Sequence, residues 1–205
     1  MQLKTVVKQK LKKLYLFGKG GEQTLLVGNR VPQTFFATDG AGESDITVHA
    51  GSYHLALKEA GIERCNIITY SSILPGIAVE VEKQDNFPDN LTHGEVMETI
   101  MAVANAEQGQ RATAGIIFGW LFDRQSGEKY GGLVCEYHGE LDENDAVESL
   151  RASLNELYVN GYSERFVLKE DRILMKSFVP QKKFGTALVS LCFTDYVYPL
   201  LGVAK

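Results

Sequence analysis

The stretch Asn66-Ile67-Ile68-Thr69-Tyr70-Ser71-Ser72-Ile73-Leu74-Pro75 passes from strand-forming residues to two adjacent serines and then to a proline. Ile, Thr and Tyr favour strands, and Pro75 cannot donate a ladder hydrogen bond, so we expect a strand that ends before the proline. The Ser71–Ser72 peptide bond therefore lies where a rigid strand passes into a loop.

A serine hydroxyl at such a point has two interpretations. Ser72 Oγ lies close to the Ser71 carbonyl and, if nearby donors polarise that carbonyl, can attack it and replace the amide by an ester. Elimination from the ester would cut the chain and leave a dehydroalanine, which hydrolyses to a pyruvoyl group. The alternative is a turn in which both hydroxyls satisfy backbone groups, as an isolated Ser-Ser pair favours.

Composition narrows the class of protein. The chain has 205 residues, 21 basic and 26 acidic, and its net charge of -5 gives no reason to expect a nucleic-acid partner. A chain of this length should bury roughly 70% of its unfolded surface, enough for a core in one domain or in two packed halves. No apolar run approaches the roughly 18 residues that span a bilayer, and no signal peptide is recognisable.

The three cysteines, Cys65, Cys135 and Cys192, are odd in number and far apart. This pattern argues against a disulfide framework and favours a reducing, cytoplasmic compartment. A zinc site would need more clustered ligands, so we expect no metal.

Residue periodicity predicts an α+β fold in which antiparallel pairs dominate, with about seven strands and three helices. The expected strands cover residues 31–38, 64–70, 77–81, 112–121, 130–137, 164–179 and 184–196, and the strands at 112–121 and 130–137 are expected to form a hairpin. Helices are expected at 52–60, capped by Ser52 and Gly61, from the Thr92–Glu95 capping box through residue 104, and at 142–158.

The first 20 residues carry six lysines and no acidic residue. They could form a basic amphipathic helix that binds an anionic surface, or an extension that packs one apolar edge on the core. We expect a basic extension at 1–27 followed by one domain at 28–205.

Two groups of acidic residues are candidates for a site. The expected loop at 39–45 carries glycines and the acids Asp39, Glu43 and Asp45, which could face a cation or simply form a solvated turn. On the second hairpin strand, Glu136 shares a face with Val134 and His138. A carboxylate there is costly unless it is paired or protonated, so Glu136 is either a general acid or a residue on an exposed edge.

Several ordered motifs together resemble the pyruvoyl-dependent arginine decarboxylases. The processing-site pattern Asn-x-x-x-x-Ser-Ser-[Ile/Val]-x-Pro is present at 66–75. The remaining motifs are Gly28-Asn29-Arg30-Val31-Pro32, Gly40-Ala41-Gly42-Glu43-Ser44-Asp45, Gly115-Ile116-Ile117-Phe118-Gly119-Trp120, Gly132-Leu133-Val134-Cys135-Glu136-Tyr137 and Lys183-Phe184-Gly185. The resemblance runs from about Gly28 to about Tyr196.

The resemblance implies an αββα sandwich of two mainly antiparallel sheets with outer helices, assembled as a homotrimer or a dimer of trimers with sites between subunits. It also implies cleavage between Ser71 and Ser72, with Asn66 polarising the attacked carbonyl and Ser72 becoming a covalent pyruvoyl cofactor. The pyruvoyl ketone would form a Schiff base with the small-molecule substrate, arginine, and Glu136 would return the proton to Cα as agmatine and CO2 form.

One position departs from the family pattern. His54 falls where relatives carry an aspartate that binds the guanidinium group, and a histidine cannot supply a bidentate carboxylate. Glu43, Asp45 or a neighbouring subunit could supply the charge. The alternatives are the same chemistry on another amino acid, a non-processed relative that acts as a subunit, and a hydrolase with Ser72 as nucleophile, for which no histidine lies in a triad context.

Overall fold

The computed structural model describes residues 25–83 and 90–203 of the chain. They divide into two compact units, residues 31–197 and the chain ends at 25–30 with 198–203. In the unit of the chain ends, β1 (Leu25–Val27) pairs antiparallel with β13 (Leu200–Val203). The predicted helix within residues 1–20 lies outside the described residues, and the predicted domain boundary at residue 28 stays a prediction.

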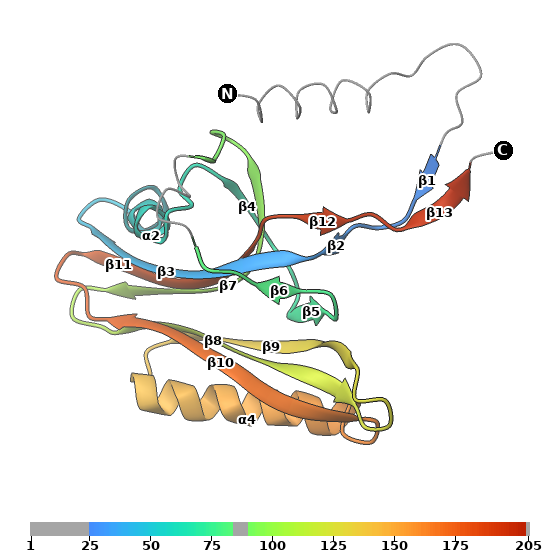
Figure 1. Cartoon of the computed structure of the whole chain (residues 1–205). Coiled ribbons are helices and arrows are strands. Elements are labelled where there is room, and N and C mark those ends of the chain that lie inside the picture. The colour runs from blue at the N-terminus through green and yellow to red at the C-terminus, as the bar shows by residue number, and fades with distance from the viewer. Residues whose placement is uncertain (1–24, 84–89, 204–205) are drawn as a thin grey trace, which may run out of the picture. The chain divides into compact units, whose positions relative to one another are not determined.

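The larger unit is built on two sheets (Figure 1). The five-stranded sheet has the order β4 (Asn66–Thr69), β7 (Val96–Glu107), β11 (Phe184–Phe193), β3 (Thr34–Ser44) and β6 (Val79–Glu80). The four-stranded sheet has the order β10 (Phe166–Phe178), β8 (Ala112–Asp123), β9 (Lys129–Gly139) and β5 (Ile73–Pro75). A short pair, β2 (Val31–Pro32) with β12 (Tyr196–Val197), continues from β3 and β11.

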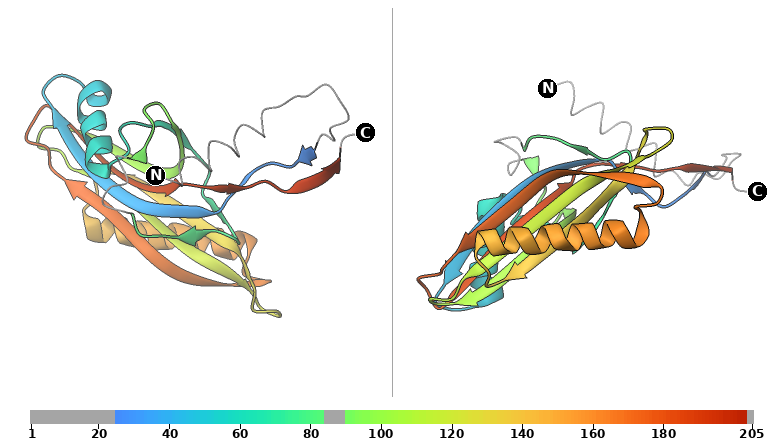
Figure 2. Two further views of the ribbon diagram at one scale, coloured as in Figure 1. Left: turned by 45° about the horizontal axis from the view of Figure 1, so that its top comes forward. Right: turned by 90° about the horizontal axis from the view of Figure 1, so that it is seen from below.

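The two sheets stack face to face, and each carries a helix on its outer face (Figures 1 and 2). One apolar cluster fills the space between the sheets and includes Phe35, Ile100 and Phe118. A second cluster joins α2 (His54–Ala60) to the five-stranded sheet, and a third joins α4 (Glu143–Gly161) to the four-stranded sheet. The predicted α+β class is confirmed, and the strand pairs that the structure describes are antiparallel apart from β3–β6 and β4–β7.

The clearest sequence patterns gave the right elements. The hairpin of β8 and β9 is present, and the helix predicted at 142–158 is α4. Asp142 caps α4 by accepting a hydrogen bond of 3.0 Å from the Asp145 N–H. Gly61 closes α2 at a φ of 73°, where a residue with a Cβ is strained.

The helix predicted after residue 92 is wrong, because residues 96–107 form strand β7. Apolar residues at helical spacing occur here because both faces of β7 are covered. Ala102 packs between the sheets, whereas Met97 and Met101 pack in the cluster below α2. A strand buried on both faces loses the alternation that marks a strand in sequence. The contact between Glu95 and the Thr92 N–H does form, at 3.0 Å, but in a turn before the strand.

The predicted loop at 39–45 is also wrong for most of its length, because β3 continues to Ser44. Its glycines allow α2 to lie close to the strand. A Cβ at Gly40 would stand 2.1 Å from the Ala56 carbonyl oxygen, and one at Gly42 would stand 2.3 Å from the Ser52 carbonyl oxygen. These glycines are therefore packing positions.

Ser52 does not cap a helix as predicted. It lies in the π-helical turn η1 (Val48–Tyr53) that leads into α2. Its buried hydroxyl donates to the Val48 carbonyl at 2.8 Å and lies 2.8 Å from Thr186 Oγ1. Of the three predicted helices, those at 52–60 and 142–158 correspond to η1 with α2 and to α4, whereas residues 96–107 form a strand.

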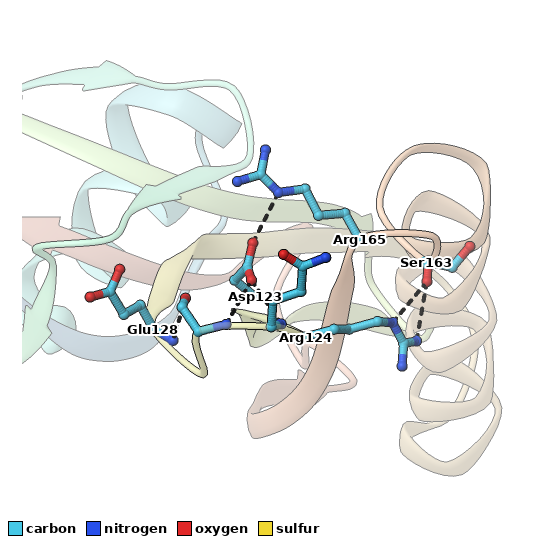
Figure 3. Close-up of polar contacts among 7 residues, drawn as sticks. Asp123, Arg124, Glu128, Ser163 and Arg165 are labelled. Atoms are coloured by element: carbon cyan, nitrogen blue, oxygen red, sulfur yellow. Dashed lines mark hydrogen bonds and ion pairs between the residues drawn. The ribbon is translucent and has the colours of Figure 1, made fainter.

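The turn between β8 and β9 is held by polar contacts around Asp123 (Figure 3). The Asp123 carboxylate accepts from the N–H groups of Gln125 at 2.9 Å and Ser126 at 3.0 Å, and from Arg165 Nε at 3.0 Å. These donors, the Ser126 N–H most strongly and then Arg165, lower the pKa of Asp123 to about 2. Arg124 of the same turn donates to the Ser163 carbonyl beyond α4.

We expect Asp123→Asn to lower the melting temperature at pH 7. A carboxylate whose folded-state pKa is depressed stabilises the fold above its unfolded pKa, about 3.9, and this contribution disappears as the pH falls through about 2. The melting temperatures of wild type and variant should therefore converge in acid. Calorimetry between pH 7 and pH 2 measures this, with Glu128→Gln as the control for loss of charge in the same turn. A pH-independent difference would contradict it.

Candidate active site

The Ser71–Ser72 bond lies in the short connection between the two sheets. Before it, β4 is an edge strand of the five-stranded sheet, and after it, β5 is an edge strand of the four-stranded sheet. The Tyr70 N–H donates to the Thr99 carbonyl on β7 at 2.7 Å, and the Ser72 carbonyl accepts from the Val134 N–H on β9 at 3.1 Å. The five-stranded sheet thus holds the chain before this bond, and the four-stranded sheet holds it after the bond.

Ser72 and Glu136 are brought into contact by this arrangement. The Ser72 hydroxyl lies 2.7 Å from both carboxylate oxygens of Glu136. Glu136 stands on β9 two residues after Val134, which is buried between the sheets, so it points toward the same inner space. Both side chains are half-buried, and Glu136 is therefore placed to take a proton from Ser72.

The Ser71 carbonyl, which Ser72 Oγ would attack, is itself polarised. It accepts a hydrogen bond of 2.7 Å from the Ile73 N–H, which closes a three-residue turn centred on Ser72. A donor on this oxygen stabilises negative charge that develops there during an attack on the carbonyl carbon. Residues 71–73 thus supply the hydroxyl and the polarised carbonyl, and Glu136 supplies the proton acceptor.

Asn66 lies at the other end of β4. Its side-chain amide donates to the Gly94 carbonyl at 2.9 Å, and its backbone N–H donates to the Glu95 carbonyl at 2.7 Å. In this structure Asn66 therefore fixes the turn that precedes β7. Its implied action on the Ser71 carbonyl stays a prediction.

The predicted substrate-binding residues lie at the opposite end of the five-stranded sheet. Glu43 accepts from the N–H groups of Gln181 at 2.7 Å and Lys182 at 3.2 Å, and Asp45 accepts from Lys183 N at 3.4 Å. His54 is exposed at the start of α2, which packs over this part of β3.

The register of the sheet gives the separation within one chain. Thr69 is level with Thr99, Cys192 and Phe36 on successive strands, whereas Glu43 is level with Gly185. From Phe36 to Glu43 the strand advances roughly 3.3 Å per residue, so about 23 Å separates Glu43 from the level of Thr69. Glu43 thus lies well away from the level at which β4 ends, and Asp45 follows it beyond the end of β3.

Sequence reasoning missed a buried acid beside the site. Glu98 on β7 is only 3% exposed, and its Oε2 accepts a hydrogen bond of 2.5 Å from the Tyr70 hydroxyl. Glu98 was hidden because residues 96–104 match a helical pattern. The available signal was the period-two series Glu98, Ile100, Ala102 and Ala104, which puts one carboxylate on an otherwise apolar inner face.

Two further findings concern what the described residues contain. No group of three or more His, Cys, Asp or Glu side chains there is arranged to hold a metal ion. None of the helices at 25–83 or 90–203 combines the length and the apolar character needed to cross a bilayer.

Comparison with known proteins gives the family. A model of the family "Pyruvoyl-dependent arginine decarboxylase (PvlArgDC)" matches residues 34–198. The chain belongs to the pyruvoyl-dependent arginine decarboxylase family. Members of this family are carboxy-lyases that are named for a pyruvoyl cofactor and for arginine as substrate. The matched region contains the Ser71–Ser72 bond and Glu136.

Individual members of the pyruvoyl-dependent arginine decarboxylase family are similar over most of the chain. The enzyme AaxB of Chlamydia muridarum is 32% identical over 190 residues, which cover 82% of this chain and 94% of the relative. AaxB of Chlamydia abortus is 33% identical over 191 residues with the same coverage. The pyruvoyl-dependent arginine decarboxylase of Methanocella arvoryzae is 32% identical over 120 residues, covering 52% of this chain and 70% of the relative.

Proposed function

We propose that this chain decarboxylates arginine to agmatine and makes its own pyruvoyl group by cutting the Ser71–Ser72 bond. The proposal depends mainly on the 2.7 Å contact of the Ser72 hydroxyl with both carboxylate oxygens of Glu136. The carbonyl of the preceding residue, Ser71, accepts a hydrogen bond from the Ile73 N–H. Family membership and the names of the relatives support the reaction class.

Cleavage begins when the Ser72 hydroxyl gives its proton to Glu136 and Oγ bonds to the Ser71 carbonyl carbon. The Ser71 C–N bond breaks, the nitrogen of Ser72 takes the proton, and an ester joins the two residues. Removal of the Ser72 Cα hydrogen then breaks the Cβ–Oγ bond, so that Ser71 leaves as a carboxylate and residue 72 becomes dehydroalanine. Addition of water and loss of ammonia give the pyruvoyl group.

Glu136 has a second task in the cut enzyme. The pyruvoyl group, when present, supplies the electron sink for the carbanion that decarboxylation leaves at Cα. Cleavage removes the hydroxyl that Glu136 contacts, so its carboxyl becomes available to the substrate at residue 72. Glu136 then holds a proton and delivers it to the substrate Cα.

The substrate side chain needs residues from elsewhere. Within one chain Glu43 is about 23 Å along β3 from the level of Thr69, at roughly 3.3 Å per residue, and Asp45 follows it beyond the end of the strand. We therefore assign recognition of the guanidinium group to a neighbouring subunit of a homotrimer or a dimer of trimers, whose Glu43 or Asp45 would approach Ser72.

A second candidate is the same chemistry on another amino acid. It is favoured by His54, because an imidazole offers no bidentate carboxylate to a guanidinium group. Turnover of arginine compared with other amino acids separates the two. Arginine turnover with an unchanged KM in Glu43→Gln and Asp45→Asn variants would contradict the role given to these acids.

The experiment that tests the proposed function is the intact mass of purified wild-type protein with and without borohydride. We expect two chains, 1–71 and 72–205, and a gain of two hydrogen atoms on the second chain after reduction of its ketone. A single undivided chain with an ordinary serine at position 72 would overturn the proposal and favour a non-processed relative that acts as a subunit.

A further inference from the structure

We propose that Tyr70 and Glu98 form a buried hydrogen-bonded pair that positions the Ser71–Ser72 bond for cleavage. The inference rests on the self-cleavage proposed above and adds two positioning residues to it. Neither side chain touches the reacting atoms, so the pair acts through the backbone that Tyr70 shares with Ser71.

Tyr70 is the last residue that the five-stranded sheet holds before the bond to be cut. Its N–H donates to the Thr99 carbonyl at 2.7 Å, and its hydroxyl donates to Glu98 Oε2 at 2.5 Å. Its ring packs against Phe193 with 5.5 Å between centroids. Three contacts thus fix the position and the direction of the chain as it leaves β4.

Ser71 has no comparable support of its own. Its side chain is exposed, and within residues 25–83 and 90–203 its carbonyl accepts from Ile73, a residue on the far side of the bond. The approach of Ser72 Oγ to the Ser71 carbonyl is therefore set by Tyr70 upstream and by the contacts of Ser72 with Val134 and Glu136 downstream. A displacement of about 1 Å between reacting groups can reduce a rate about 100-fold.

The burial of Glu98 indicates that the Tyr70–Glu98 pair does more than fill space in the core. The side chain is 3% exposed and lies on the inner face of β7 with Ile100, Ala102 and Ala104. Burying a carboxylate there costs free energy, and an apolar residue of similar size would serve the core as well or better. What the carboxylate adds is direction, because a hydrogen bond from a hydroxyl to a carboxylate is short, strong and oriented.

The test compares Tyr70→Phe with Tyr158→Phe in the full chain, made by pulse-labelled cell-free synthesis and followed on denaturing gels. Each change deletes one partly buried hydroxyl, because Tyr158 donates to the Phe166 carbonyl at 3.0 Å on the α4 side of the molecule. We expect cleavage to be at least about tenfold slower in Tyr70→Phe and unchanged in Tyr158→Phe, with similar melting temperatures.

Substitutions of Glu98 give an independent readout. Glu98→Gln keeps an acceptor for the Tyr70 hydroxyl and should cut within about threefold of the wild-type rate, whereas Glu98→Leu should be slowed as much as Tyr70→Phe. The double variant Tyr70→Phe/Glu98→Leu should be no slower than either single variant, because both delete the same hydrogen bond.

The outcomes separate this inference from the proposed function. If wild type is cut and Tyr70→Phe is cut equally fast, the positioning role is wrong and the proposed function stands. If Tyr70→Phe and Tyr158→Phe are slowed equally, the hydroxyl supports only the fold and the inference is overturned. If wild type is never cut, the proposed function and the positioning role are both wrong.

Discussion

Replacing Ser72 by alanine will leave the chain undivided and abolish decarboxylation. The substitution removes the hydroxyl that contacts Glu136 and thus both the nucleophile for the Ser71 carbonyl and the precursor of the cofactor. Because the hydroxyl lies in a half-buried connection, its loss should change the melting temperature little. We expect one band on a denaturing gel, no borohydride-reducible carbonyl and a fall in kcat of at least about 1,000-fold.

The control is Ser153→Ala, which deletes a serine hydroxyl on the exposed face of α4. It should cut and turn over as wild type does. A Ser72→Ala chain that still divides would place the nucleophile at another residue, and one that stays whole but keeps its activity would show that the reaction does not use a pyruvoyl group.

Glu136→Gln should produce the second-largest effect. Glutamine keeps the size of the side chain and an oxygen for the Ser72 hydroxyl, but it cannot accept the proton as a carboxylate does. A positioned general base contributes about 10²–10⁴-fold, so cleavage should slow by about that factor. The fraction that is cut should also decarboxylate slowly, because the same residue returns the proton to Cα. Time courses of cleavage and kcat per reducible carbonyl measure the two effects.

Glu140→Gln is the matched control, since Glu140 is an exposed carboxylate just beyond the end of β9. It should leave both rates unchanged. Cleavage of Glu136→Gln at the wild-type rate would mean that another group takes the Ser72 proton, and normal turnover of the cut enzyme would assign the Cα proton to another donor.

The residues nearest to the chemistry could be found in the sequence because they are local or belong to clear strands. Ser71 and Ser72 follow a run of strand formers and precede a proline, and Glu136 stands in a hairpin with regular alternation. Glu98 could not be found in the same way. It lies on a strand with two buried faces, where the apolar residues recur at helical spacing, and its partner Tyr70 follows a different strand, β4.

The sequence by itself determined the α+β class, the β8–β9 hairpin, the α4 helix and the point at which a strand gives way to the serine pair. These features depend on residue order over short distances, where side-chain periodicity and turn residues act directly. Only the tertiary structure decided that Ser72 meets Glu136, that Tyr70 meets Glu98, and that Glu43 and Asp45 bind a distant turn. Strand register and the stacking of two sheets determine which distant residues meet, and they follow from the packing of the whole chain.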